Sequence, residues 1–261
     1  MTTTAVTTWL GTLWKHPEST QAPRAIDTIK TSLGKGETIG NPNHVRKHGS
    51  ILAGAEKVAL IWMAQRLPHW VNSDHLTLIG FASMLVAGVA FTAANRHPLA
   101  LIFVVLALAL NWFGDSLDGT LARVRNQLRP RYGFYVDHVL DMVGTFSLLG
   151  GLAFSGYMNP LLALGMLAAY LTAAAEEFLA THVRRVFHLS FLGFGPTELR
   201  IILAIGTLYL LYKPWVHLGS LGSFRLFDVG GVVAIAGLAL KVAVSAVRNT
   251  HALYMEERLP R

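Results

Sequence analysis

The sequence predicts an all-α protein that crosses a membrane about six times, with an amphipathic helix on the membrane surface before the first crossing. Composition is the first reason: 52% of the 261 residues are hydrophobic, only 14% are charged, and the mean hydropathy is +0.44. A soluble domain usually has about a quarter charged residues. The second reason is a series of apolar segments, each with roughly the 20 residues that a membrane-spanning helix needs.

The N-terminal part of the chain differs from the rest. Residues 1–50 are polar and rich in Thr, Gly, Pro and Lys, which is typical of a loop. Residues 51–67 mix one acidic and two basic residues with apolar ones, which predicts the surface helix. We therefore expect a cytoplasmic or interfacial segment over residues 1–75 and a six-helix membrane domain over residues 76–261. A cleaved signal peptide is not expected, because the start lacks a basic region followed by an apolar core.

Six segments are predicted to span the membrane: residues 76–95, 98–121, 133–156, 160–181, 197–212 and 227–247. The loop "RVRNQLRPR" at residues 123–131 and the C-terminal tail are basic, whereas the connection "SGYMNP" has no Lys or Arg. Cytoplasmic loops collect basic residues, so we place both termini and the 123–131 loop in the cytoplasm, which in a bacterium means the inner membrane. The same bias accounts for the net charge of +7 without a nucleic-acid partner.

Four aspartates lie where the second and third predicted helices meet. Asp115 and Asp118 are three residues apart and Asp137 and Asp141 are four apart, so each pair shares one helix face. A short loop joins the helices, which makes them antiparallel neighbours whose acidic faces can converge. A carboxylate at the bilayer centre costs about 2.5–3.5 kcal/mol on insertion scales, and four converging anions also repel one another. The absence of cysteine excludes thiolate ligands, and Mg²⁺ or Mn²⁺ with oxygen ligands suits the cluster.

The residues around the aspartates suit a phosphate-bearing ligand. Gly119 lets a ligand approach the backbone closely, and Ala122 keeps the same helix face narrow. Arg123 offers a fork of donors that matches phosphate oxygens. Gly133 opens the third helix where it meets the second. Two metal ions a few ångströms apart can hold a phosphoryl group between nucleophile and leaving group.

Taken together, these positions form a motif that resembles the signature of the CDP-alcohol phosphotransferase family. In this chain it runs Asp115-x2-Asp118-Gly119-x2-Ala122-Arg123-x9-Gly133-x3-Asp137-x3-Asp141. Members of the family are membrane enzymes of phospholipid synthesis that transfer a substituted phosphate from a CMP-containing donor to an alcohol and release CMP. The resemblance therefore implies a CDP-linked donor and an alcohol or lipid acceptor, both used at the membrane. A homodimer is one state of assembly that the sequence leaves open.

The resemblance also implies a role for each residue of the motif. The four aspartates would hold two divalent ions, Mg²⁺ or Mn²⁺, and Asp141 would in addition take the proton of the acceptor hydroxyl. The nucleotide would be contacted from Asp115, Gly119, Ala122 and Arg123, with Gly133 close by. Asn111 lies one turn before Asp115, where it can orient that carboxylate.

A second segment is similar to one branch of the family. "LPHWVNSDHLTLIGF" at residues 67–81 resembles the segment before the first helix of choline and ethanolamine phosphotransferases, which tend to have Pro-Asn where this chain has Ser73-Asp74. Asp74 thus occupies the position of a nucleotide-contacting Asn and is a further candidate contact. The likeness favours a soluble CDP-aminoalcohol donor with diacylglycerol as acceptor. A CDP-diacylglycerol donor with a small polar alcohol remains the alternative.

The fifth predicted helix supplies the remaining candidates. Glu198 begins this helix, and an acid in a membrane helix is a functional candidate, here a second catalytic group that helps the acceptor lose its proton. Arg184, Arg185 and Arg200 are the cations that could hold an anionic acceptor. A function of another class is a cation transporter with the acids as its ion site. That function predicts acids along a pore near the membrane midplane, whereas these acids cluster at one end of their helices.

Overall fold

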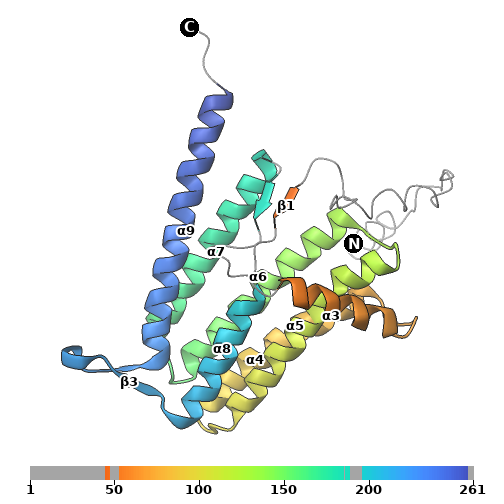
Figure 1. Cartoon of the computed structure of the whole chain (residues 1–261). Coiled ribbons are helices and arrows are strands. Elements are labelled where there is room, and N and C mark those ends of the chain that lie inside the picture. The colour runs from red at the N-terminus through yellow and green to blue at the C-terminus, as the bar shows by residue number, and fades with distance from the viewer. Residues whose placement is uncertain (1–44, 48–52, 185, 189–195, 258–261) are drawn as a thin grey trace, which may run out of the picture. The chain divides into compact units, whose positions relative to one another are not determined.

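The computed structural model describes residues 45–47, 53–184, 186–188 and 196–257, which are mostly helical (Figure 1). The helices are α3 (Ala53–Arg66), α4 (Ser73–Ala94), α5 (Ala100–Val124), α6 (Pro130–Phe154), α7 (Pro160–Arg184), α8 (Pro196–Tyr212) and α9 (Leu226–Glu256). Strand β1 (Val45–Lys47) pairs in parallel with β2 (Val186–His188), and β3 (Trp215–His217) pairs antiparallel with β4 (Ser223–Arg225) around the short 3₁₀ turn η1 (Gly219–Leu221). The loop predicted over residues 1–50 lies outside the described residues, apart from β1.

Helices α4 to α9 correspond one by one to the six predicted segments. The ends differ by three residues or fewer, except that α9 continues to Glu256, nine residues beyond the predicted end at 247. In the part of the chain that the structure describes, α4, α5, α7 and α9 are long and apolar enough to span a membrane. Helix α8 has only 17 residues, and Asp137 and Asp141 lower the hydropathy of α6. The chain is an all-α polytopic membrane protein, as predicted.

Proline and asparagine mark where several helices begin. Pro130, Pro160 and Pro196 are the first residues of α6, α7 and α8. Proline suits this position because its missing N–H would have no partner within the helix and its φ is already helical. At α7 the side chain of Asn159 also accepts a hydrogen bond from the backbone N–H of Leu161 at 2.9 Å, which satisfies one free donor of the first turn.

A compact helix end determines how α5 and α6 face each other. Asn126 has a φ of 55°, the left-handed conformation that commonly ends helices. The N–H of Gln127 bonds to the carbonyl of Ala122 at 2.8 Å, and the N–H of Asn126 bonds to the carbonyl of Arg123 at 3.2 Å. These two bonds form a Schellman motif. The chain therefore reverses directly after Arg123, so that α6 returns antiparallel and brings its aspartates back toward those of α5.

Close packing through glycine joins α4 to α5 and α6. A Cβ placed on Gly151 of α6 would lie 1.9 Å from the carbonyl oxygen of Gly88 of α4. A Cβ on Gly114 of α5 would lie 2.5 Å from the carbonyl oxygen of Leu76. Without side chains at these points the backbones touch, which is how membrane helices gain van der Waals contact. The same three helices supply most of the main buried core, which includes Ala87, Phe91, Leu101, Val104, Leu108, Leu148 and Leu152.

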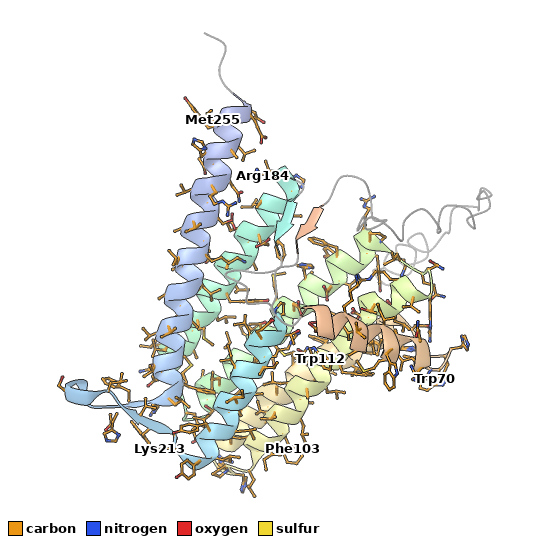
Figure 2. All side chains as sticks on the ribbon, viewed as in Figure 1. Trp70, Phe103, Trp112, Arg184, Lys213 and Met255 are labelled. Carbon is orange, nitrogen blue, oxygen red and sulfur yellow. The ribbon has the colours of Figure 1, made fainter. Side chains whose placement is uncertain are left out.

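Many large apolar side chains remain exposed on the outer faces of the helices. Phe103 of α5, Leu161 of α7 and Tyr212 of α8 are 62%, 77% and 85% exposed, and Figure 2 shows Phe103 projecting away from its helix. Soluble proteins rarely expose contiguous apolar surface of this kind. In a membrane protein these side chains contact lipid, which agrees with the span assignment.

The glycine contact between α4 and α6 generates the first prediction. We expect Gly151→Ala to lower the stability of the purified protein by about 1–3 kcal/mol, because the new methyl group would overlap backbone atoms that cannot move independently. The measurement is the thermal unfolding midpoint in detergent. Gly150→Ala is the matched control, since a Cβ at Gly150 meets nothing within 4 Å. Equal midpoints for the two variants would contradict the close approach of the helices.

Candidate metal centre

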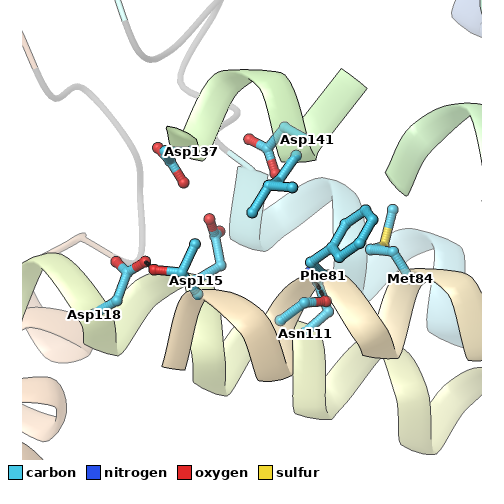
Figure 3. A pocket seen from close by; sticks show the side chains of 10 residues that line it. Phe81, Met84, Asn111, Asp115, Asp118, Asp137 and Asp141 are labelled. Atoms are coloured by element: carbon cyan, nitrogen blue, oxygen red, sulfur yellow. Dashed lines mark hydrogen bonds between the residues drawn. The ribbon is translucent and has the colours of Figure 1, made fainter. Parts of the chain in front are cut away.

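Three of the four predicted aspartates converge between the second half of α5 and the first half of α6. Asp115 of α5 and Asp137 and Asp141 of α6 each offer a carboxylate oxygen, and these oxygens all lie within 4.8 Å of one another. Figure 3 shows Asp137 and Asp141 facing Asp115 across the gap between the two helices. The spacing of four residues on α6 places its pair on one face, and the reversal after α5 turns that face toward Asp115. Carboxylate oxygens are the ligands that hard divalent cations prefer, so this group fits such an ion.

Asp118 lines the same pocket but directs its carboxylate to other partners. Its Oδ2 accepts a hydrogen bond from the hydroxyl of Thr77 on α4 at 2.6 Å, and its Oδ1 accepts one from the N–H of Gly119. The hydroxyl of Ser73 donates to the backbone carbonyl of Asp118. The predicted share of Asp118 in a two-metal site therefore stays a prediction. Thr77 was missed by the sequence reasoning, although it lies one helical turn after Ser73 and so shares its face.

Helix α8 brings a cation to the aspartates. Arg200 donates a hydrogen bond to Asp115 through Nη2 at 2.5 Å, and both side chains are largely shielded from solvent. His138 lies next to the group as well, with its Nδ1 3.8 Å from Asp137. Arg200 compensates part of the negative charge where α5, α6 and α8 meet. Of the three arginines singled out in the sequence, it is the one whose described contacts lie at this site.

Three of the predicted nucleotide contacts, Gly119, Ala122 and Arg123, lie in the last turns of α5, and Gly133 lies in the first turn of α6. The guanidinium of Arg123 donates through Nε to the carbonyl of Gly119 at 2.9 Å, while Ala122 is buried beside it. A Cβ placed on Gly119 would meet only the end of the Arg123 side chain, at 3.6 Å, and one on Gly133 would meet nothing within 4 Å. Packing within the described residues therefore does not require glycine at either position, and among these residues only the flexible end of Arg123 lies beside Gly119.

Two further polar groups, Asn111 and Tyr170, belong to the surroundings of the aspartates. Asn111 is only 3% exposed and lines the pocket. Its Nδ2 donates to the carbonyl of Gly80 at 3.0 Å, whereas its buried Oδ1 has no hydrogen-bond partner among the described residues. The side chain of Tyr170 of α7 is hydrogen-bonded to Thr145 and interacts electrostatically with Asp141. Asn111 was singled out from its spacing, but no sequence signal pointed to Tyr170.

Asp74 lies apart from this group, in the first turn of α4. It forms an ion pair with Arg129, which precedes α6, and both side chains are about half exposed. The hydrogen bond to Asp74 raises the pKa of Arg129 above its usual value, so this guanidinium remains charged. Asp74 therefore ties the start of α4 to the loop before α6, and its predicted contact with a nucleotide stays a prediction.

Two of the remaining predicted residues lie in different parts of the structure, Glu198 at the start of α8 and Arg184 between α7 and α9. Glu198 is 7% exposed in the first turn of α8, two residues before Arg200. Arg184 bonds instead to Asn249 of α9 at 2.8 Å, and Arg185 lies outside the described residues. Helices α7 and α9 are also tied by a pair between Glu177 and Lys241 at 2.9 Å. This second polar group links two helices and is separate from the aspartates.

The ion pair between Arg200 and Asp115 leads to a prediction for metal binding. We expect Arg200→Gln to raise the affinity of the purified protein for Mn²⁺ by about tenfold in the absence of substrates, because the guanidinium competes with the metal for Asp115. Electron paramagnetic resonance of free Mn²⁺ measures this binding.

Two controls accompany that measurement. Asp137→Asn should lower the affinity, and Arg248→Gln, an exposed arginine of α9, should leave it unchanged. Unchanged Mn²⁺ affinity in Arg200→Gln would show that the arginine and the metal do not share Asp115.

Known proteins resemble this chain over its helical part. An archaetidylinositol phosphate synthase of Pyrococcus horikoshii is 32% identical over 89 residues, which are 34% of this chain and 44% of that protein. The inner membrane protein YnbA of Escherichia coli is 26% identical over 155 residues, which are 59% of this chain and 75% of that protein. The chain thus spans less than half the length of the first relative and three quarters of the second.

A family model described as CDP-alcohol phosphatidyltransferase matches residues 70–243. The match begins just before α4 and ends within α9, so it includes the aspartates of α5 and α6 and the first turn of α8. It covers well over half of the chain. It confirms the resemblance predicted from the aspartate motif. The chain belongs to the CDP-alcohol phosphatidyltransferase family.

Proposed function

We propose that this protein transfers a substituted phosphate from a CDP-linked donor to an alcohol and releases CMP, with divalent cations held by the aspartates of α5 and α6. One observation carries the proposal. Carboxylate oxygens of Asp115, Asp137 and Asp141 lie within 4.8 Å of one another at the end of apolar helices. Such a group of anions in a low-dielectric setting is stable only with positive charge beside it, and one arginine compensates only part of it.

A divalent ion fits the donor set, since all three groups are hard oxygen ligands. When bound, Mg²⁺ or Mn²⁺ would neutralise the diphosphate of the donor and orient it for displacement. Asp118 lies one turn from Asp115 in the same pocket, so a small rotation of its side chain would add a fourth carboxylate. We therefore keep Asp118 in the proposed site for two ions.

The nucleotide half of the donor would lie along the end of α5. Gly133 meets no other described atom, and Gly119 has only the movable end of Arg123 beside it, so a ligand could approach the helix backbone closely at both. Arg123 stands exposed at this helix end, where its guanidinium can bind phosphate oxygens in pairs. These residues place the CMP group outside the aspartates and direct its diphosphate toward them.

The transfer itself is an in-line displacement at the β-phosphorus of the donor. The oxygen of the acceptor hydroxyl forms the new bond to phosphorus as the bond to the α-phosphate oxygen breaks, and CMP leaves with that electron pair. Asp141, whose carboxylate faces Asp115, takes the hydroxyl proton. Most of the rate comes from holding the reacting atoms in line.

The position of Arg200 bears on the donor class. A CDP-lipid donor with a phosphorylated polar acceptor needs a cation beside the metal ions, and Arg200 is such a cation on α8. The relative from Pyrococcus is named for a product that carries an inositol phosphate group. We therefore favour this class, with Arg200 on the acceptor side. The CDP-aminoalcohol class, supported by residues 67–81 and by Glu198 as an acid near the acceptor, is the second candidate.

The central test is a substrate panel. We expect purified protein with Mg²⁺ to release CMP from CDP-diacylglycerol in the presence of a phosphorylated polyol, and chelation to abolish the release. Asp141→Asn and Asp118→Asn should lower the rate by about 100-fold or more, because each replaces an anionic oxygen that would hold a divalent cation with a neutral amide, and Asp141 would also take the hydroxyl proton. Product formation is followed by chromatography of CMP.

The panel has a control variant and clear contrary outcomes. Glu256→Gln removes an exposed carboxylate far along α9 and should keep full activity. Release only from CDP-choline or CDP-ethanolamine with diacylglycerol would select the second donor class. Release of CMP without any divalent ion, or full activity of Asp141→Asn, would contradict the proposed chemistry.

A separate prediction concerns the side of the membrane that the site faces. The chain has no cysteine, so single cysteines can be introduced without a background. Gln127→Cys, in the exposed loop between α5 and α6, should react with a membrane-impermeant maleimide only after cells are opened, because basic loops stay in the cytoplasm. Ser220→Cys, in the connection between α8 and α9, should react in intact cells. The reverse pattern would invert the proposed orientation.

A further inference from the structure

A single carboxylate of α3 connects this helix to α5, which carries Asp115, and to α8, which carries Arg200. Oε1 of Glu56 accepts hydrogen bonds from the indole of Trp112 at 2.8 Å, from the hydroxyl of Ser116 at 3.3 Å and from the hydroxyl of Thr197 at 2.7 Å. Trp112 and Ser116 belong to α5, and Thr197 belongs to α8. Figure 2 shows Trp112 where α3 crosses α5.

The donors to Glu56 are immediate neighbours of residues at the site. Ser116 follows Asp115, and Thr197 precedes Glu198 in the first turn of α8. Arg200, which pairs with Asp115, comes three residues after Thr197 and therefore shares its face of the helix. The negative charge of Glu56 also lies at the N-terminus of α8, where the helix dipole favours an anion. Glu56 is thus linked, through Ser116 and Thr197, to the helix positions of both Asp115 and Arg200.

Apolar packing holds α3 where Glu56 can make these bonds. Leu60 and Ala64, on the inner face of α3, are buried in one cluster with Leu117 and Leu121 of α5. Helix α8 packs against α5 and joins the main core through Leu210, with Leu203 and Ala204 against it. The bond between Glu56 and Thr197 therefore adds a polar restraint on the first turn of α8, which precedes these apolar contacts.

We propose that Glu56 is a positioning residue that holds the first turn of α8, with Arg200 and Glu198, at a set distance from the aspartates of α5. The proposal rests on the proposed function in one respect, because the first turn of α8 is taken as the acceptor side of the site. Glu56 touches neither substrate, and its effect passes through Thr197 and Ser116. Loss of Glu56 should therefore impair use of the acceptor more than binding of the CDP-linked donor, which lies along α5.

The kinetic test compares five variants of the whole chain in lipid nanodiscs. Glu56→Ala should raise the acceptor KM by about tenfold, the scale of one lost hydrogen bond to a charged group, while the donor KM stays within about twofold. Glu56→Gln keeps an acceptor oxygen and should lie between the wild type and Glu56→Ala. Thr197→Val should raise the acceptor KM, and the double variant should be no worse than Glu56→Ala, because both act through one bond. Lys57→Ala, the exposed neighbour on α3, should behave as wild type.

A distance measurement tests the same proposal without any substrate. Spin labels on cysteines at Leu199 of α8 and Tyr135 of α6, which are 60% and 70% exposed, report where α8 lies relative to the site. Glu56→Ala and Thr197→Val should broaden the distance distribution between the labels, and Lys57→Ala should not.

The outcomes separate this proposal from the proposed function. If the wild-type protein releases no CMP from any donor, the proposed function fails, and the label distances alone decide the role of Glu56. Unchanged distances in Glu56→Ala would overturn the positioning role. So would equal increases in donor and acceptor KM, or losses that simply add in the double variant.

Discussion

The approach of three carboxylates at the end of apolar helices is the constraint on which this structure depends. Oxygens of Asp115, Asp137 and Asp141 lie within 4.8 Å of one another, although like charges repel strongly where water is scarce. Such an arrangement persists only when the surrounding helices leave the side chains no other position and when positive charge is close. The remainder of the fold meets these two requirements in different places.

Rigid placement comes from backbone contact. Gly88 meets Gly151 between α4 and α6, and Gly114 meets Leu76 between α4 and α5, so α4 fixes both acid-bearing helices at once. The Schellman motif after Arg123 then reverses the chain within a few residues. Arg125 reinforces the turn, because its guanidinium donates to backbone carbonyls of the connection between α3 and α4. Membrane helices gain little from hydrophobic association in lipid, which makes such close contacts the main source of their geometry.

Compensating charge comes from the start of α8. The later part of α8 packs in the main core through Leu210, whereas Leu199, Ile201, Ile202 and Ile205 are exposed. Polar contacts, from Thr197 to Glu56 and from Arg200 to Asp115, therefore contribute to the placement of its first residues. A helix end held by a few polar bonds can shift when a cation or a charged substrate changes those bonds. This property suits the acceptor side that we propose for α8, since substrates must enter and leave there.

Sequence alone determined the class of the protein, its helices and its family. Apolar segments of about 20 residues cannot form anything but helices in a bilayer, because each backbone polar group must be satisfied within its own segment. The aspartate spacing of three and four residues likewise determines a shared face before any packing is known. The connection through residues 123–131 is short enough to make α5 and α6 antiparallel, so the convergence of their acids could be predicted as well.

Only the tertiary structure determined which of the predicted site residues contact one another. Asp118 shares a helix face with Asp115, yet its carboxylate bonds to Thr77, because α4 packs on that side of α5. Arg200 and Glu56 are far from the aspartates in sequence, and local spacing carries no information about contacts across 85 or 60 residues. Arg184 looked equivalent to Arg200 in the sequence but bonds to Asn249 on another pair of helices. Periodicity determines which face of a helix a residue occupies, whereas only the packing of helices against one another determines what that face contacts.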